Sequence, residues 1–235
     1  MTGDNSSIAF TAGSTAGSVT LTNSDLSAAR VDLTALSGSV LHGPDGLIDT
    51  VQLHMRSSAG VSALTRAEDV EAVVSVAGDI RIRNLRGMRL LADTANGAIE
   101  VSAAGSINAE RVVAQGTSQH NGISVSALSA SEGSLSDIWL GTLTSSDTGN
   151  ITLVATGRID GLANVVVDAQ GLQARSLKIM AQEVPNLVLR ASEADITVLG
   201  PGDLSITELG VGALTLSASL RNGALTVNHA LGDLT

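Results

Sequence analysis

Residues 78–101 read GDIRIRNLRGMRLLADTANGAIEV and contain one short pattern twice. A glycine is followed, at alternate positions, by two aliphatic residues, first in GDIRI from Gly78 and again in GAIEV from Gly97. Alternation with a period of two is typical of a strand that buries one face, and the glycine is typical of the turn before it. The stretch therefore predicts two equivalent strands that lie one repeat apart.

Superposing the two copies places apolar residues on apolar residues and opposite charges on each other. The superposed pairs are Gly78 with Gly97, Ile80 with Ile99, Ile82 with Val101, and Arg81 with Glu100. Opposite charges at stacked positions help by a few tenths of a kcal/mol, roughly, and like charges cost a similar amount. The stretch therefore predicts parallel stacking in which Ile80 lies on Ile99 and Arg81 lies on Glu100.

The same pattern recurs along the chain. Further copies are GSVTL from Gly17, GNITL from Gly149 (with Ile151 and Leu153), GDLSI from Gly202, GALTL from Gly212 and GALTV from Gly223. Equivalent aliphatic positions also recur at a step close to that between Gly78 and Gly97, for example from Leu177 to Ile196 and from Leu204 to Leu225. A recurring step of roughly 20 residues is the signature of a solenoid.

The sequence therefore predicts an all-β fold, a single-stranded parallel β-helix. We expect about 20 residues per coil, about 12 coils, and a right-handed path like that of other strand-crossover-strand connections. An antiparallel all-β fold stays open as an alternative, because Asn-Gly pairs at 96–97, 121–122 and 222–223 also fit hairpin turns.

Residues 1–235 are interpreted as one continuous β-helical segment, less regular at 42–76 and 105–148. A truncated copy of the pattern at Gly232 leads us to expect a piece of a longer solenoid. In SALTRAEDVEAVV, residues 62–74, apolar residues also recur at helical spacing, so a short helix there is an alternative to strands.

Composition limits the function classes. Hydrophobic residues make up 43% and charged residues 15%, so the chain is expected to fold rather than to be disordered. A formal net charge of -10 argues against nucleic acid as a partner, and the chain lacks any apolar run of membrane-spanning length. The sequence contains no cysteine, which excludes disulfides, Cys-ligated metals and thiol catalysis. Aromatic residues at 1% are too few to line a typical ligand pocket.

Two stretches resemble a known family. GAIEVSAAGSINAE at 97–110 and GNITLVATGRIDG at 149–161 are similar to the degenerate repeats of filamentous-haemagglutinin-like bacterial exoproteins, which are large secreted adhesins. The resemblance implies a β-helical shaft, a secreted or bacterial cell-surface location, and a glycan or protein receptor on a host or neighbouring cell as partner. The start MTGDNSSIAF departs from the family, because it carries neither a signal peptide nor a secretion-signal domain.

The chain is expected to be non-catalytic, with no catalytic residues, cofactor, metal site or membrane insertion. No nucleophile elbow, P-loop or His-Glu-x-x-His motif is present, and the four histidines are interpreted as surface or turn residues. The alternative is a carbohydrate-active β-helix enzyme or a glycan-binding module. Its candidate paired carboxylates are Glu68, Asp69 and Glu71, Glu132 and Asp137, and Glu193 and Asp195.

Four arginines lie close together in this acidic chain: Arg81, Arg83, Arg86 and Arg89. They form the candidate ligand-binding site, because arginine forks suit the carboxylates of an anionic glycan or of a protein partner. The favoured alternative is that they pair with acids on neighbouring coils. Unpaired strand edges at the end coils also predict end-to-end self-association if the chain is a fragment.

Overall fold

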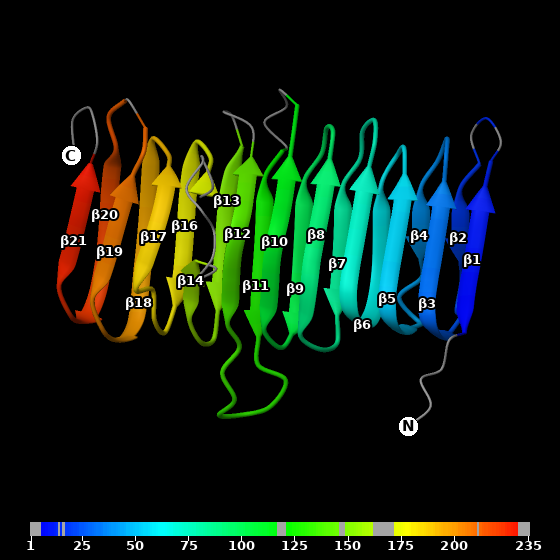
Figure 1. The fold of residues 1–235 in the computed structure, drawn as a ribbon, viewed down its shortest axis with the longest axis horizontal. Helices are drawn as coiled ribbons and strands as arrows, with labels where there is room; N and C mark the ends of the chain where they lie inside the picture. The colour runs from blue at the N-terminus through cyan, green and yellow to red at the C-terminus, as the bar shows by residue number, and fades with distance from the viewer. Residues whose placement is uncertain are drawn as a thin grey trace.

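The computed structural model describes residues 6–13, 15, 17–116, 121–145, 149–161, 172–210 and 212–229. Within these ranges every regular element is a strand, and the strands stack in parallel to form a β-solenoid of about 10 turns, about 21 residues apart. The parallel β-helix prediction is confirmed, whereas the expected number of about 12 coils is too high. Insertions such as residues 129–137, which project from one edge of the rod, lengthen individual turns (Figure 1).

The strands form two parallel stacks that share the long strand β6 (Val61–Val74). The first stack consists of β1 (Ser7–Ala12), β3 (Leu26–Ala35), β5 (Ile48–Ser57), β6, β8 (Met88–Thr94), β10 (Ile107–Ala114), β12 (Ile138–Ser145), β14 (Ile159–Gly161), β15 (Leu172–Gln173), β17 (Asn186–Arg190), β19 (Leu204–Glu208) and β21 (Leu225–His229). The second stack consists of β2 (Val19–Leu21), β4 (Val40–His42), β6, β7 (Ile80–Asn84), β9 (Ile99–Ala104), β11 (Ile123–Leu128), β13 (Asn150–Ala155), β16 (Ser176–Ala181), β18 (Glu193–Pro201) and β20 (Thr215–Asn222). Figure 1 shows β1 and β21 at opposite ends of the rod.

The register between β7 and β9 is the one that the sequence predicts. Ile80 pairs with Ile99, Arg81 with Glu100, and Ile82 with Val101. Ile99 pairs in turn with Ile123, and Ile123 pairs with Ile151 of the GNITL copy. The repeat residues therefore form continuous aliphatic rows along the interior of the second stack.

The alternative of a helix at 62–74 is wrong, because these residues lie in β6, a strand of 14 residues. Its inward positions are Val61, Ala63, Thr65, Ala67, Val70, Ala72 and Val74. The outward residues Glu68 and Asp69 are consecutive, so the strand bends there and the alternation changes phase. A period-two pattern with one phase shift places apolar residues three and four apart, which explains the resemblance to a helix.

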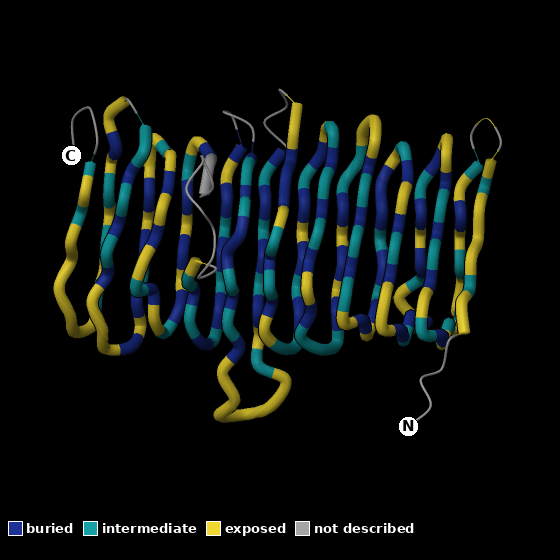
Figure 2. The backbone as a smooth tube through the Cα atoms, in the orientation of Figure 1, coloured by how far each residue is buried: buried dark blue, intermediate teal, exposed yellow. Residues whose placement is uncertain are grey.

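A single hydrophobic cluster fills the interior. Buried and exposed residues alternate along most strands, and Figure 2 shows this alternation as changing colours along each turn. One inward row of the first stack runs the length of the rod through Phe10, Leu33, Met55, Ala72, Ala92, Val112, Leu143, Leu189 (in register with Leu143 by way of β15), Glu208 and His229. These members are apolar up to Leu189, and the last two are ionisable.

Candidate functional site

Arg81 and Arg83 are exposed on the outward face of β7, as the strand alternation predicts. Arg81 lies between two acids: its Nη2 is 2.6 Å from Oδ2 of Asp79, and its Nε is 3.8 Å from Oε2 of Glu100. The predicted Arg81–Glu100 contact is therefore present. Arg83 pairs in register with Ser102 of β9, and no ion pair or hydrogen bond of its side chain is found among the described residues.

The other two arginines of the predicted site lie elsewhere. Arg86 is in the turn after β7, and its Nη2 is 2.6 Å from Oε1 of Glu68. Arg89 is on β8 in the first stack, where its guanidinium donates to both carboxylate oxygens of Glu110 at 2.7 and 2.6 Å. The structure therefore does not bring the four arginines to one face, because the chain turns from the second stack to the first between Arg83 and Arg89.

An ion-pair belt covers the outward side of the first stack from β3 to β10. Besides the pairs of Arg86 and Arg89, the belt contains Arg30–Asp32, Arg56–Glu71, Arg66–Asp49 and Arg111–Asp93, and His54 Nδ1 lies 3.2 Å from Oδ1 of Asp32. Most of these pairs join neighbouring coils. Each exposed pair stabilises the fold by at most about 1 kcal/mol, but each also gives the arginine a partner within the chain. An anionic ligand would have to compete with these carboxylates.

Two carboxyls of the belt have lowered pKa values. The hydrogen bonds from Arg89 lower the pKa of Glu110, and the hydrogen bond from Arg30 lowers that of Asp32. A carboxyl whose pKa is lower in the folded than in the unfolded chain stabilises the fold above its unfolded pKa. This contribution is lost as the pH falls through the folded pKa.

We expect the Glu110→Gln variant to lose less stability than the parent chain when the pH is lowered from 7 to 3. The variant lacks the carboxylate that Arg89 holds ionised, so one proton-linked contribution disappears. The difference at pH 7 should not exceed about 1 kcal/mol, because the pair is partly exposed. Thermal unfolding of both proteins at pH 7 and pH 3 checks this. An equal loss of stability in the two proteins would contradict the link between the ionisation of Glu110 and folding.

The candidate carboxylates are not gathered in a cleft. Glu68, Asp69 and Glu71 face Arg86, Arg89 and Arg56, respectively. Asp137 accepts a hydrogen bond from the backbone N–H of Arg158. Glu132 is exposed in the insertion 129–137, and Glu193 and Asp195 are exposed on β18.

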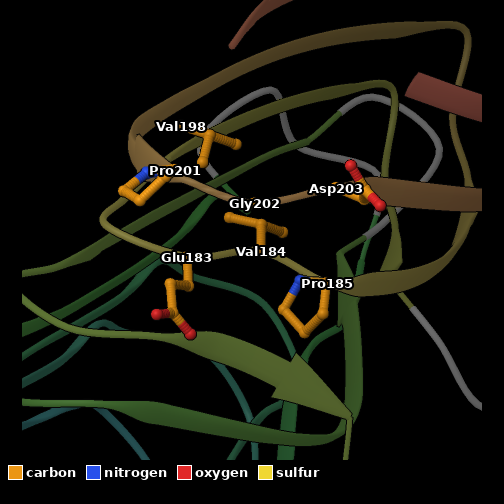
Figure 3. Close-up of a pocket in the computed structure, with 7 residues that line it drawn as sticks. All are labelled: Glu183, Val184, Pro185, Val198, Pro201, Gly202 and Asp203. Carbon is orange, nitrogen blue, oxygen red and sulfur yellow. The ribbon is translucent and has the colours of Figure 1, made fainter. Parts of the chain in front are cut away.

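One pocket lies at the turns that precede β17 and β19 and has a volume of about 190 Å³. Glu183, Val184, Pro185, Val198, Pro201, Gly202 and Asp203 line it. In Figure 3 the carboxylates of Glu183 and Asp203 lie on different sides of the pocket and point in different directions. Asp203 Oδ1 also accepts a hydrogen bond from the N–H of Ala224 at 2.8 Å. The two acids are therefore not arranged as a facing pair.

Trp139 lies on the outward side of β12, in register with Asn108 of β10 and Asp160 of β14. The guanidinium of Arg158 lies 6.0 Å from the centre of its ring and pairs with Asp160. The tryptophan face is thus partly covered by a cation of the chain itself.

Two histidines, His42 and His229, depart from the expectation that the histidines are surface or turn residues. His42 and His229 point inward, because each occupies an inward position of a strand, whereas His54 is outward beside Asp32. His229 Nδ1 lies 2.8 Å from Oε2 of the buried Glu208, whose Oε1 accepts the N–H of Gly210. Glu208 and His229 are 21 residues apart in the sequence, which equals the length of one coil. The sequence spacing could therefore have indicated that the two residues stack.

His120 lies outside the described residues. His42 lies on β4 in the second stack, and His54 lies on β5 in the first stack. Across the part of the chain that the structure describes, no group of three or more potential metal-ligating side chains is found. The same ranges contain no helix that could span a membrane.

No protein-family model, curated protein or solved structure matches this chain.

Proposed function

We propose that this chain is a non-catalytic, structural shaft segment of a secreted or cell-surface adhesin-like exoprotein. The observation that carries the proposal is the continuous parallel stacking from β1 to β21 around one apolar interior. About 10 turns at about 4.8 Å each give a rod of about 50 Å. Such a rod holds whatever lies at its ends or in its loops at a fixed distance.

The surface supports the same proposal. Most arginines of the first stack are paired with acids of adjacent coils. Their charges therefore stabilise the stack and are not left unpaired for a ligand. Aliphatic side chains make up most of the interior. The insertion 129–137 projects beyond the edge of the rod, where a shaft would present a contact loop (Figure 1).

The location can be tested on cells of the source organism. Antibodies against the chain are expected to label intact, unpermeabilised cells or to detect the chain in the culture medium. An antibody against a cytoplasmic protein serves as the control for intact membranes. Labelling that requires permeabilisation, with none of the chain in the medium, would contradict a secreted or surface-exposed shaft.

A second candidate function, binding of an anionic glycan on the second stack, rests on Arg83. Arg83 is exposed and pairs in register with Ser102, which is followed in the same outward row by Ser126. Arg83→Ala is expected to weaken binding to an acidic polysaccharide about tenfold, whereas Arg86→Ala, which removes a paired arginine, should leave binding unchanged. Equal binding by both variants and the parent chain, measured by calorimetry, would remove this candidate.

A further inference from the structure

The outward face of the second stack carries charged side chains that have no partner within the described part of the chain. They are Arg83, Lys178, Glu193 and Asp195, and all four are exposed. None of these side chains makes an ion pair or a hydrogen bond with another described residue. The first stack differs from β3 to β10, because most charges of its ion-pair belt are satisfied within the chain. The second stack therefore offers unpaired charges of both signs on one face.

The charges of this face follow a definite order along its middle outward row. Each member of the row pairs in register with the next: Arg81, Glu100, Ser124, Thr152, Lys178 and Asp195. The midpoint of the row lies between β11 and β13. Charges at equal distances from this midpoint have opposite signs, since Arg81 matches Asp195 and Glu100 matches Lys178.

This order makes the face complementary to a second copy of itself. A two-fold axis along the strand direction, placed between β11 and β13, would bring two copies together with their rods antiparallel and would reverse the order of each row. Arg81 then lies opposite Asp195 of the second copy, and Glu100 lies opposite Lys178 of the second copy. Each contact occurs twice by symmetry. Parallel rods, with the axis over the middle row, would instead place every charge opposite itself, which is unfavourable.

The flanking positions at the two ends of the face also have opposite net charges. In the antiparallel arrangement, Asp79, Arg81 and Arg83 of one copy face Glu193 and Asp195 of the other. The first group carries a net positive charge, because it contains two arginines and one aspartate, and Asp79 is itself paired with Arg81. The second group is wholly acidic.

The centre of the face and its size suit a contact between two sheets. Its central side chains are small and uncharged: Ser102, Ser124, Ser126, Thr152 and Val154. The strands lie side by side along a straight rod (Figure 1). From β6 to β20 the strands at about 4.8 Å spacing, with about five residues each, cover about 650 Å² per copy. Two copies together bury about 1,300 Å², within the range of about 1,200–2,000 Å² for specific interfaces.

We propose that two copies of this chain pair side by side, with antiparallel rods, through the outward face of the second stack. The contact is isologous, so it closes and stops at two copies. The pairing goes beyond the proposed shaft function and does not depend on where the chain is located. It covers Arg83, so an acidic polysaccharide bound there would compete with the second copy.

Charge reversal tests the contact between Glu100 and Lys178. Light scattering should give twice the mass of one chain for the parent protein. Glu100→Lys and Lys178→Glu each place like charges opposite each other and should weaken the dimer at least about tenfold. The double variant Glu100→Lys/Lys178→Glu restores opposite charges and should dimerise again. The matched control is Arg190→Glu, which reverses an exposed charge on β17 of the first stack and should leave the dimer unchanged.

Cross-linking tests the antiparallel arrangement, because the chain contains no cysteine. Ser102 faces Met180 of the second copy, so Ser102→Cys/Met180→Cys should give a covalent dimer, and nothing larger, with the shortest bis-maleimide. Within one chain these two positions are three coil steps of about 4.8 Å apart, which is too far for that reagent. Ser62→Cys alone is the control, because Ser62 lies at one end of the middle row and would face itself only in parallel rods.

Circular dichroism confirms that each variant keeps its β-sheet signal. A parent chain that is monomeric at every concentration at which it stays soluble would overturn the pairing. A dimer that both single reversals leave intact, or that the double reversal does not restore, would overturn the contact through this face. A cross-linked Ser62→Cys dimer would overturn the antiparallel arrangement.

Discussion

The Gly78→Ala substitution is expected to lower the free energy of unfolding by about 2–6 kcal/mol, the sum of a strain cost and a steric cost. Gly78 has a φ of +145°, a conformation that residues with a Cβ rarely adopt. A Cβ at this position would also lie 2.3 Å from the carbonyl oxygen of Ala59, a backbone atom of the neighbouring coil that cannot move aside. Backbone strain of about 1–3 kcal/mol and a steric cost of about 1–3 kcal/mol add at this position.

Two other glycines separate these contributions. Gly202 has a φ of +144°, but a Cβ there meets no atom within 4 Å, so Gly202→Ala should cost only the strain. Gly161 has neither a positive φ nor a close atom, and Gly161→Ala should be nearly neutral. Urea unfolding followed by circular dichroism measures all three. Equal costs for the Gly78 and Gly202 variants would contradict the close approach of the coils at Gly78.

The second large effect is expected for Asn84→Ala, at about 3 kcal/mol, because it strips several buried groups of their partners. Asn84 is 1% exposed and ties β6 to the turn after β7. Its Oδ1 accepts hydrogen bonds from Thr65 Oγ1 and the N–H of Ala67, and its Nδ2 donates to the carbonyls of Ala67 and Arg86. Each buried group left unsatisfied costs roughly 1–3 kcal/mol before the chain relaxes.

The matched control is Asn150→Ala on β13, where the asparagine is exposed. Its effect should stay within about 0.5 kcal/mol, as for most surface substitutions. Chemical unfolding of both variants gives the comparison. Similar stabilities of the two variants would contradict this account. They would mean that water satisfies the groups that Asn84 binds and that the Asn84 amide does not hold β6 to the turn after β7.

The parts of the fold that repeat could be predicted from the sequence. Ile80, Ile99 and Arg81 could be placed because a strand period of two and the step from Gly78 to Gly97 act together, and a shift by one position would turn every inward side chain outward. The outward direction of Arg83 follows from the same alternation.

The corners could not be predicted in the same way. At Glu68 and Asp69 two consecutive residues point outward, and this single phase shift made β6 look like a helix. Arg86 and Arg89 were assigned to one site with Arg83 because they are close in sequence, yet the turn between β7 and β8 moves Arg89 to the other stack. The inward pair of Glu208 and His229 was missed because inward positions were identified by their apolar residues. An ionisable residue at such a position is read as outward.

Parallel, in-register stacking of successive coils is tested most directly by one disulfide measurement. Ser102 of β9 pairs with Ser126 of β11 on the outward side, and Thr152 of β13 lies two coils from Ser102. In the otherwise cysteine-free chain, Ser102→Cys/Ser126→Cys should oxidise rapidly within one molecule and keep its β-sheet signal, whereas Ser102→Cys/Thr152→Cys should stay reduced. No intramolecular disulfide in the first protein, or equal oxidation in both, would contradict the solenoid.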